Sequence, residues 1–273
     1  MSSIRKTNKI TVGTFRTKKK SVEKITVLTA YDFYTAQLLD RVGIDAVLVG
    51  DSAGNVIHGF DNTIPVTMEM MLLHTAAVAR GTEKALIIAD MPFMSFQPSI
   101  ETAITNAGRF LKEARAEAVK VEGGLEMVPT VKRLVECGIP VMGHIGLTPQ
   151  SINRFGGPMI QGKKDKSRTY LMESALALED AGCFAMVLEL MEADLAAEIT
   201  ATLKSAATIG IGAGAGCDGQ VLVINDMLGL RPDGFKPKFL REYANLTPYI
   251  EKAVKQYIDD VKQGKFPNKN ESY

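Results

Sequence analysis

The chain lacks the features that mark secreted, membrane-spanning or disulfide-stabilised proteins. No apolar run approaches the roughly 18 residues needed to cross a membrane, and the basic first 24 residues contain no apolar signal core. A solvated N-terminal cap over 1–23 is therefore expected, with an organellar import segment left open. The three cysteines are far apart and form no CxxC pair, which predicts reduced thiols and a cytoplasmic location.

An excess of charge of one sign is also missing. The formal net charge of +1 creates no field over the whole protein, so we expect small-molecule substrates and neither nucleic acid nor a membrane as partner. With 273 residues, 46% hydrophobic and 23% charged, the composition is that of an ordinary globular protein. No linker or charge run divides the chain, which predicts one domain over 1–273.

Short apolar segments that read as strands recur along the chain, most of them separated by helical patterns. They are 24–30, 45–50, 85–90, 118–123, 140–146, 184–190, 208–214 and 221–226. Strand, loop, helix, glycine and strand repeated about eight times predict an α/β protein with a single (β/α)8 TIM barrel. The stretch 215–220 is too short for a full helix, so the last unit is either truncated or misassigned.

Helix boundaries have their own signals. Apolar residues fall on one face over 125–137, and Pro98 is expected to open another helix. Four glycines are expected to end helices, namely Gly43, Gly81, Gly138 and Gly182. The loops over 51–66, 91–97 and 145–168 are long, which is typical of the active-site face of such a barrel. The last of them is a candidate lid.

Acidic residues follow several of the expected strands. Asp51, Asp90 and Glu122 end the second, third and fourth strands, which are neighbours if strand order follows the sequence. Three clustered carboxylates need a cation or protons, and oxygen donors without dense His or Cys favour Mg²⁺. Each carboxylate could instead cap the helix that follows it.

Other polar residues share these strands. Lys120 is two residues before Glu122 and is expected on the same inward face, where it pairs with an anionic substrate or only shields its neighbours. Glu189 ends the sixth strand, across the mouth, and is a candidate general base; a helix cap or an ion pair with Arg154 or Lys163 is the alternative. His144 ends the fifth strand and is either a substrate contact or a packed histidine.

Two further patterns carry less information. His74 lies in a helical run and is expected to be structural, whereas His58 sits in a loop with no derivable role. Gly214, Gly216 and Gly219 match the GxGxxG dinucleotide pattern, but a strand-like run follows where that fingerprint needs a helix. Close approach of the backbone to a substrate explains these glycines better.

The ordered motifs of the chain resemble those of the ketopantoate hydroxymethyltransferase family, the 3-methyl-2-oxobutanoate hydroxymethyltransferases of pantothenate synthesis. They are TAYD (29–32), VGDS (49–52), PVT (65–67), HTAAV (74–78), ADMPFMS (89–95), VKVEGG (119–124), GHIGLTPQ (143–150), FGG (155–157), IQG (160–162), LALEDAG (176–182), IGIGAG (209–214) and CDGQVLV (217–223). They span about residues 20 to 265. The departures at Ala215-Gly216 and at 58–60 remove no residue assigned to chemistry.

The resemblance implies a Mg²⁺-dependent barrel of the phosphoenolpyruvate- and pyruvate-handling type and a large homo-oligomer, a decamer. It implies metal ligands at Asp51, Asp90 and Glu122, a proton acceptor at Glu189, and substrate contacts. The implied substrate-binding residues are Asp51, Ser52, Asp90, Lys120 and His144. The implied reaction transfers a hydroxymethyl group from 5,10-methylenetetrahydrofolate to 3-methyl-2-oxobutanoate through a metal-stabilised enolate.

Other interpretations stay open from the residues alone. They are a Mg²⁺-dependent carbon–carbon lyase or aldolase acting on oxo acids, a non-catalytic metabolite-binding barrel, and a nicotinamide-dependent oxidoreductase. A requirement for folate separates the first of these from the transferase. In the third long loop, a basic group is either a solvated surface or a site that attracts the folate tail; its members are Lys163, Lys164, Lys166 and Arg168.

Overall fold

The computed structural model describes residues 9–21, 23–231 and 236–273. By its internal contacts the chain forms two compact units, Met1–Val223 and Ile224–Tyr273. The expectation of one domain over 1–273 stays a prediction.

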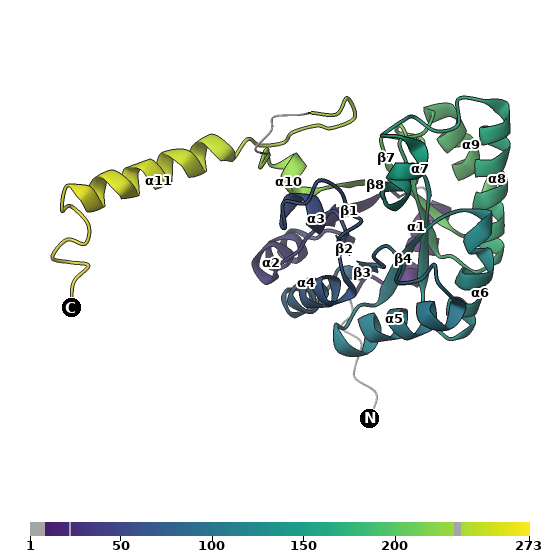
Figure 1. The fold of residues 1–273 in the computed structure, drawn as a ribbon, viewed down its shortest axis with the longest axis horizontal. Coiled ribbons are helices and arrows are strands. Elements are labelled where there is room, and N and C mark those ends of the chain that lie inside the picture. Colours follow the sequence, from purple (N-terminus) through teal and green to yellow (C-terminus); the bar gives the residue numbers. More distant parts are fainter. Residues whose placement is uncertain (1–8, 22, 232–235) are drawn as a thin grey trace. The chain divides into compact units, whose positions relative to one another are not determined.

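The first unit is a closed barrel of parallel strands surrounded by helices (Figure 1). In the part of the chain that the structure describes, the strands follow one another around the barrel in sequence order, and β8 closes against β1. They are β1 (Ile25–Thr29), β2 (Ala46–Val49), β3 (Leu86–Asp90), β4 (Ala118–Glu122), β5 (Val141–Gly146), β6 (Ala185–Glu189), β7 (Ala207–Ile211) and β8 (Gly219–Leu222). The predicted (β/α)8 fold is confirmed.

Helices connect most of these strands. They are α1 (Val12–Ser21), α2 (Phe33–Val42), α3 (Ala53–Val56), α4 (Met68–Gly81), α5 (Ile100–Glu113), α6 (Val128–Glu136), α7 (Ile152–Phe155), α8 (Asp165–Asp180) and α9 (Ala193–Thr202), with 3₁₀ turns η1 (Leu125–Met127) and η2 (Pro149–Ser151). The connections from β2 to α4 and from β5 to α8 contain short helices of their own. They lie at the carboxyl ends of the strands, where the sequence predicted the long loops.

The eighth strand differs from its prediction. The expected segment was 221–226, but β8 begins two residues earlier, at Gly219, which pairs with both Ile25 of β1 and Ile209 of β7. Residues Ile224–Met227 form the short helix α10 instead of continuing the strand. No described residue between β7 and β8 is helical, so the last unit is truncated.

One helix ends at the predicted glycine, although not through a left-handed conformation, and the start of another was predicted wrongly. Gly81 is the last residue of α4, and the cap is Thr82 in an extended conformation. A Cβ atom at Gly81 would lie within van der Waals overlap of the carbonyl oxygen of Phe33, so this glycine lets α4 pack closely on α2. Pro98 precedes α5 rather than opening it, because Ser99 is the N-cap and its hydroxyl accepts a hydrogen bond from the Thr102 amide.

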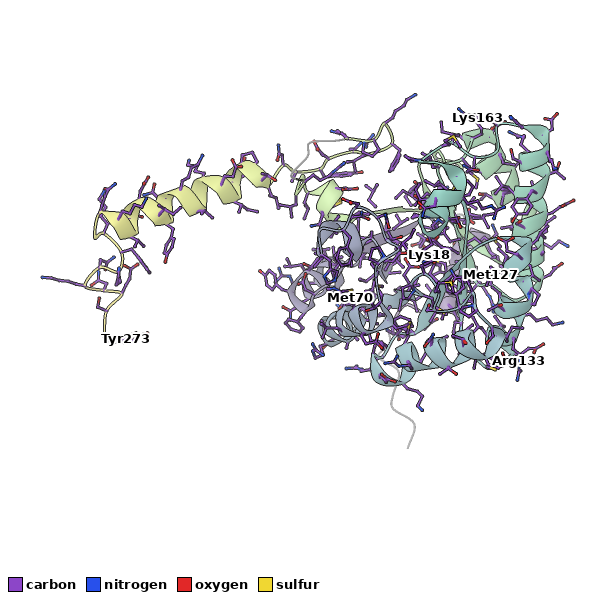
Figure 2. All side chains as sticks on the ribbon, viewed as in Figure 1. Lys18, Met70, Met127, Arg133, Lys163 and Tyr273 are labelled. Carbon is purple, nitrogen blue, oxygen red and sulfur yellow. The ribbon has the colours of Figure 1, made fainter. Side chains whose placement is uncertain are left out.

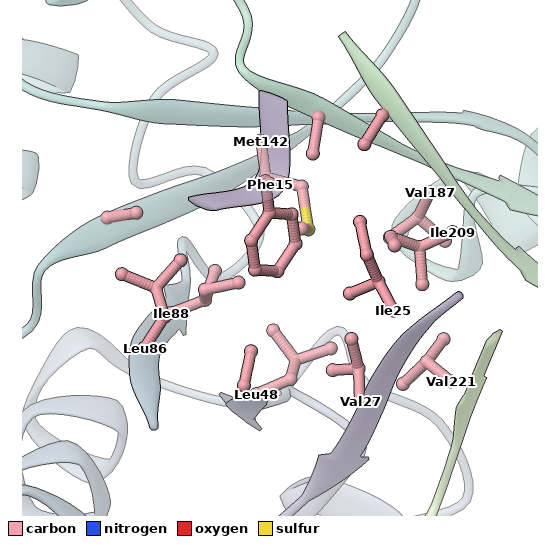
Figure 3. Packing of buried hydrophobic residues seen from close by; sticks show 14 of the residues in the cluster. Phe15, Ile25, Val27, Leu48, Leu86, Ile88, Met142, Val187, Ile209 and Val221 are labelled. Atoms are coloured by element: carbon pink, nitrogen blue, oxygen red, sulfur yellow. The ribbon is translucent and has the colours of Figure 1, made fainter. Parts of the chain in front are cut away.

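The core of the barrel is closed at one end by the N-terminal helix α1. Its only buried residue is Phe15, which is fully buried and packs edge-on against Phe184, with ring centroids 5.5 Å apart. Figure 3 shows Phe15 among inward side chains of several strands, including Met142, Ile88 and Ile25. Within the described part of the cap expected over 1–23, α1 is fixed to the barrel by Phe15 and by the ion pairs of Lys18 with Asp45 and of Lys19 with Asp218.

The second unit contains α10 and the longer helix α11 (Thr247–Lys262). None of the side chains of α11 is buried, and they project from the helix on all sides (Figure 2). Among the described residues, no helix is long and apolar enough to cross a membrane.

Candidate active site

Along strand β4 the interior of the barrel changes from an apolar core to a polar site. Its inward residues alternate along the strand, as the two-residue period of a strand requires, and run Ala118, Lys120, Glu122. Ala118 belongs to the apolar cluster, whereas Lys120 and Glu122 are only 3% and 6% exposed. The carboxyl end of the barrel interior is therefore charged although it is almost sealed from water.

The register of the parallel strands brings the other charged residues beside β4. Lys120 lies opposite Asp90 of β3, and Glu122 lies opposite His144 of β5. One strand further on, Glu189 of β6 lies opposite Gly146 of β5. Four consecutive strands thus place their polar residues at one end of the barrel.

Lys120 links these side chains. Its Nζ atom lies 2.8 Å from Oδ1 of Asp90, 3.6 Å from Oε1 of Glu122 and 2.9 Å from Nδ1 of His144. Nδ1 of His144 is also 3.3 Å from Glu122 Oε1, and its Nε2 is 3.1 Å from Oε2 of Glu189. The predicted residues of β3, β4, β5 and β6 therefore form one continuous network of ion pairs.

Asp51 and Ser52 join the site from the end of β2. The backbone amide of Asp51 donates to Oδ2 of Asp90 at 3.2 Å, and the Asp51 side chain is 4% exposed. The hydroxyl of Ser52 lies 2.8 Å from that of Tyr31, which follows β1. A Cβ atom at Gly50 would lie 2.8 Å from Ser52 Oγ, so the glycine allows the Ser52 hydroxyl to lie close to the backbone here.

The carboxylates differ in how well their charge is compensated. Burial, reinforced by Asp90 and Glu122, raises the pKa of Asp51 well above its usual value. Burial also raises the pKa of Asp90 despite the adjacent Lys120 ammonium. For Glu122, burial is outweighed by His144 and Lys120, which lower its pKa. The site therefore needs further positive charge at Asp51 and Asp90.

His144 can take two hydrogen-bonding arrangements. Burial and Lys120 oppose its positive charge, but Glu122 and Glu189 outweigh them and raise the pKa of His144 to about 9. The charged ring is attracted to Glu122, 3.3 Å from Nδ1, and to Glu189, 3.1 Å from Nε2; in the neutral ring Nδ1 can accept a hydrogen bond from Lys120. The protonation state of His144 thus decides whether its Nδ1 interacts with Lys120 or with Glu122.

The carboxylate oxygens of this site are the possible ligands for a divalent cation. No three His, Cys, Asp or Glu side chains within the described ranges are arranged so that they could hold a metal ion. Asp90 Oδ1 and Glu122 Oε1 are nevertheless buried without a hydrogen bond of good geometry. Mg²⁺ usually takes one or two carboxylates and completes its shell with water and substrate. The chemistry of the buried carboxylates Asp51 and Asp90 suits this cation, and the metal-ligand roles of Asp51, Asp90 and Glu122 stay predictions.

Several supporting residues were not predicted. Gln150 donates through Nε2 to Asp51 and to the Met91 carbonyl, and its backbone amide donates to Glu122. Tyr31 holds Ser52. Gln150 and Tyr31 lie in loops after β5 and β1, where no periodicity shows which side chains turn inward. Both residues lie within the motifs that resemble the family, but those motifs do not show what the side chains contact.

The two remaining histidines pair with each other. His58 Nε2 lies 3.0 Å from His74 Nε2, and His74 Nδ1 donates to the Tyr31 carbonyl at 2.7 Å. His74 is thus structural, as the sequence indicated, and the ring of His58 stacks on Phe60. The pair lies beside the Tyr31–Ser52 contact and braces the β2–α4 connection.

The glycines of the seventh unit have a packing role that the sequence analysis did not predict. A Cβ atom at Gly214 would lie 2.6 Å from Cβ of Ala193, and one at Gly216 would lie 2.7 Å from Cβ of Ala197. Both positions therefore let the chain approach α9 rather than a substrate. Near the start of α8, Arg168 is paired with Asp194 at 3.1 Å and with Glu198 at 3.4 Å, so its charge is engaged at the surface.

Solved structures with the same fold define the class of this barrel. A 2,3-dimethylmalate lyase of the PEP mutase/isocitrate lyase superfamily aligns with a TM-score of 0.58 and 15% identity, over 94% of this chain and 89% of that one. A phosphonopyruvate hydrolase in complex with oxalate and Mg²⁺ aligns with a TM-score of 0.59 and 12% identity, over 96% and 93%. The chain thus shares its TIM-barrel fold with these enzymes.

Sequence relatives give the family. The model of the ketopantoate hydroxymethyltransferase family matches residues 9–269. The 3-methyl-2-oxobutanoate hydroxymethyltransferase of Syntrophus aciditrophicus (strain SB) is 56% identical over 273 residues, all of both chains. The enzyme of that name from Thermotoga neapolitana is 58% identical over 251 residues, 92% of each chain. This chain belongs to the ketopantoate hydroxymethyltransferase family, and its relatives are named as transferases.

Proposed function

We propose that this protein transfers a hydroxymethyl group from 5,10-methylenetetrahydrofolate to 3-methyl-2-oxobutanoate and gives ketopantoate, with Mg²⁺ bound at the carboxyl end of the barrel. The observation that carries the proposal is the meeting of Asp51, Asp90 and Lys120 with the His144–Glu189 pair in one buried network. An oxo acid needs a cation for its carboxylate and a base for its C3 hydrogen, and this network offers both.

Asp51 and Asp90 would hold the ion, because both carboxylates are buried and under-compensated. When bound, Mg²⁺ supplies Lewis-acid polarisation of the keto group and so makes the neighbouring C3 hydrogen more acidic. The head of the oxo acid would bind beside Ser52 Oγ and Asp90 Oδ2, where a side chain at position 50 would intrude.

The substrate carboxylate is bound by Lys120 and Ser52 in this proposal. Lys120 has three N–H donors, of which Asp90 takes one and a neutral His144 would take a second, so at least one remains for the substrate in either state of the histidine. Ser52 is held by Tyr31, and its hydroxyl can turn toward a carboxylate while its oxygen still accepts the tyrosine proton. These contacts orient C3 of the oxo acid.

Glu189 removes the C3 proton. Its side chain is 19% exposed, more than any other carboxylate of the network, so it faces the space where substrate enters. Nε2 of His144 lies 3.1 Å from Glu189 Oε2 and holds the carboxylate in place. The resulting enolate forms a C–C bond to the methylene carbon of the folate, and water supplies the hydroxyl oxygen. Both C–N bonds of the methylene carbon break, and the two nitrogens take up the C3 proton and a proton of the water, so that tetrahydrofolate leaves.

The assembly and location belong to the same proposal. Apolar residues follow helical spacing along α11 and are 40–59% exposed, namely Ile250, Val254, Tyr257, Ile258 and Val261. An uncovered apolar face of this length supports a homo-oligomer. The three free cysteines support a reducing, cytoplasmic location.

Exchange of the substrate C3 hydrogen with solvent deuterium tests the role of Glu189. Glu189→Gln should slow exchange by about 10²–10⁴-fold, the usual contribution of a general base, while oxo-acid binding is largely retained. Glu136→Gln, which removes an exposed carboxylate on α6, is the control. Undiminished exchange in Glu189→Gln would remove this residue from the base role.

A direct assay of ketopantoate formation, with and without chelator and folate, tests the whole proposal. Loss of product on adding chelator and on omitting folate is the expected result. Turnover of the oxo acid without any folate would instead favour a carbon–carbon lyase on the same barrel.

A further inference from the structure

Gln150 has an unusual number of contacts for a loop glutamine. It lies in the 3₁₀ turn η2 after β5 and is 4% exposed. Its Nε2 atom donates to Oδ2 of Asp51 and to the carbonyl oxygen of Met91, both at 2.9 Å. Its backbone amide donates to Oε2 of Glu122 at 3.0 Å. One residue thus contacts two carboxylates of the site and the chain that follows β3.

The orientation of the Gln150 amide is fixed by its partners. A carbonyl oxygen can only accept, so the nitrogen and not the oxygen must face Met91. The oxygen, Oε1, accepts from Nε2 of Gln97 at 3.2 Å. Because both N–H groups of Gln150 are used, the side chain cannot rotate without breaking hydrogen bonds in a buried environment.

These contacts limit what Asp51 can do. One oxygen of the Asp51 carboxylate is held by Gln150, so the other oxygen is the one available to an ion or a substrate. The donated hydrogen bond also favours the charged form of Asp51, which burial and its acidic neighbours oppose. Glu122 is held by the same residue, through the backbone.

We propose that Gln150 is a positioning residue that orients Asp51 and Glu122 for binding of a divalent cation, with Gln97 fixing the orientation of Gln150. The inference rests on the proposed function and deepens it, since it assigns to the β5–α8 connection the task of setting the geometry of the ion site. Partners that orient metal ligands typically contribute 10–100-fold to metal affinity.

Binding of Mn²⁺, used as a paramagnetic probe in place of Mg²⁺, tests the inference without reference to turnover. Gln150→Met keeps the length of the side chain and removes its hydrogen bonds. The dissociation constant of Mn²⁺, measured by electron paramagnetic resonance, should rise by about 10–100-fold. Gln37→Met makes the same change at an exposed position of α2 and should leave Mn²⁺ affinity unchanged.

A purely structural role predicts a different pattern. Gln150→Met will also lower the melting temperature, because it leaves buried acceptors without donors. If the melting temperature falls while Mn²⁺ affinity stays within about twofold of the wild type, Gln150 only supports the loop and the inference is overturned. Recovery of C3 exchange at saturating Mn²⁺ supports positioning when the variant is already folded in the absence of metal, since a bound ion also stabilises the folded state.

A second variant covers the case in which Gln150→Met does not fold. Gln97→Met leaves Gln150 in place and removes only the donor to its oxygen, so Mn²⁺ affinity should fall in the same direction by a smaller factor. If Gln150→Met does not fold, and a folded Gln97→Met protein binds Mn²⁺ with unchanged affinity, the inference that Gln97 and Gln150 orient Asp51 is contradicted. Wild-type protein that binds no Mn²⁺ and forms no ketopantoate overturns the proposed function itself, and the inference with it.

Discussion

Replacing Lys120 with methionine removes the single lysine ammonium from a nearly sealed acidic cluster. Lys120 is 3% exposed, and its Nζ lies 2.8 Å from Asp90 Oδ1. Methionine fills much of the same volume, so the main loss is the charge. Breaking a buried ion pair by removing one partner costs about 3–5 kcal/mol, because the remaining charge is left uncompensated. We expect a loss of that size for the metal-free protein near pH 8.

The loss should shrink on acidification. The pKa values of Asp51 and Asp90 are already raised in the folded protein, and without Lys120 they rise further. A raised carboxyl pKa means that the folded state binds protons more tightly than the unfolded state, so stability increases as pH falls through the folded pKa. Once protonated, the carboxyls no longer need the ammonium, and the deficit of Lys120→Met near pH 5.5 should be smaller than near pH 8.

Urea denaturation in the presence of EDTA measures this effect. Wild type, Lys120→Met, Asp90→Asn and the double variant form a double-mutant cycle. The two charges are in contact, so the double variant should be more stable than additivity predicts, with a coupling free energy of about 1–3 kcal/mol. Lys112→Met, an exposed position at the end of α5, is the control.

Two results would refute this reasoning. An additive cycle would mean that Lys120 does not compensate Asp90. An equal loss of stability near pH 5.5 and near pH 8 would mean that packing, rather than the charge of the carboxyl cluster, determines the effect.

Three further predictions concern the scaffold. Phe15→Ala should destabilise the barrel by about 3–5 kcal/mol, because a fully buried ring is lost; calorimetry should show no comparable loss for the exposed Arg16→Ala. Glu179→Gln should cost about 1–3 kcal/mol near pH 7, since the carboxylate accepts three backbone hydrogen bonds before β7. Its pKa is lowered, so this stability should be lost as pH falls through the folded pKa, and urea titration of the exposed Glu173→Gln should show neither effect. In the native protein only the exposed Cys137 should react with a thiol reagent near pH 8, because the other two cysteines are buried and burial raises their pKa values; two fast thiols would contradict this.

Strand positions and inward charges could be predicted because both follow from local pattern. The segment around β4 alternates Val119 and Val121 with Lys120 and Glu122, so the face of each residue is fixed once the strand is recognised. The same reasoning, applied to strand order, placed Asp90 beside this pair.

Contacts made by loops could not be predicted in the same way. Gln150 reaches Asp51 across 99 positions of the sequence, and a loop side chain has no period that shows its direction. The end of the barrel was also misjudged, since VLVIND reads as one apolar run although the chain turns into α10 after Leu222. Only the pairing of Gly219 with strands on both sides fixes that boundary.

The alternation along β4 also ties correct folding to catalysis. If this strand paired one position out of register, its valines would enter the barrel and its lysine and glutamate would turn toward the helices. Such a misfolded chain would bury two charges among apolar helices and would also lose the proposed ion site. Deleting Val119 should therefore give a protein that aggregates rather than a stable but inactive one, so selection for solubility alone would help to preserve the catalytic strand.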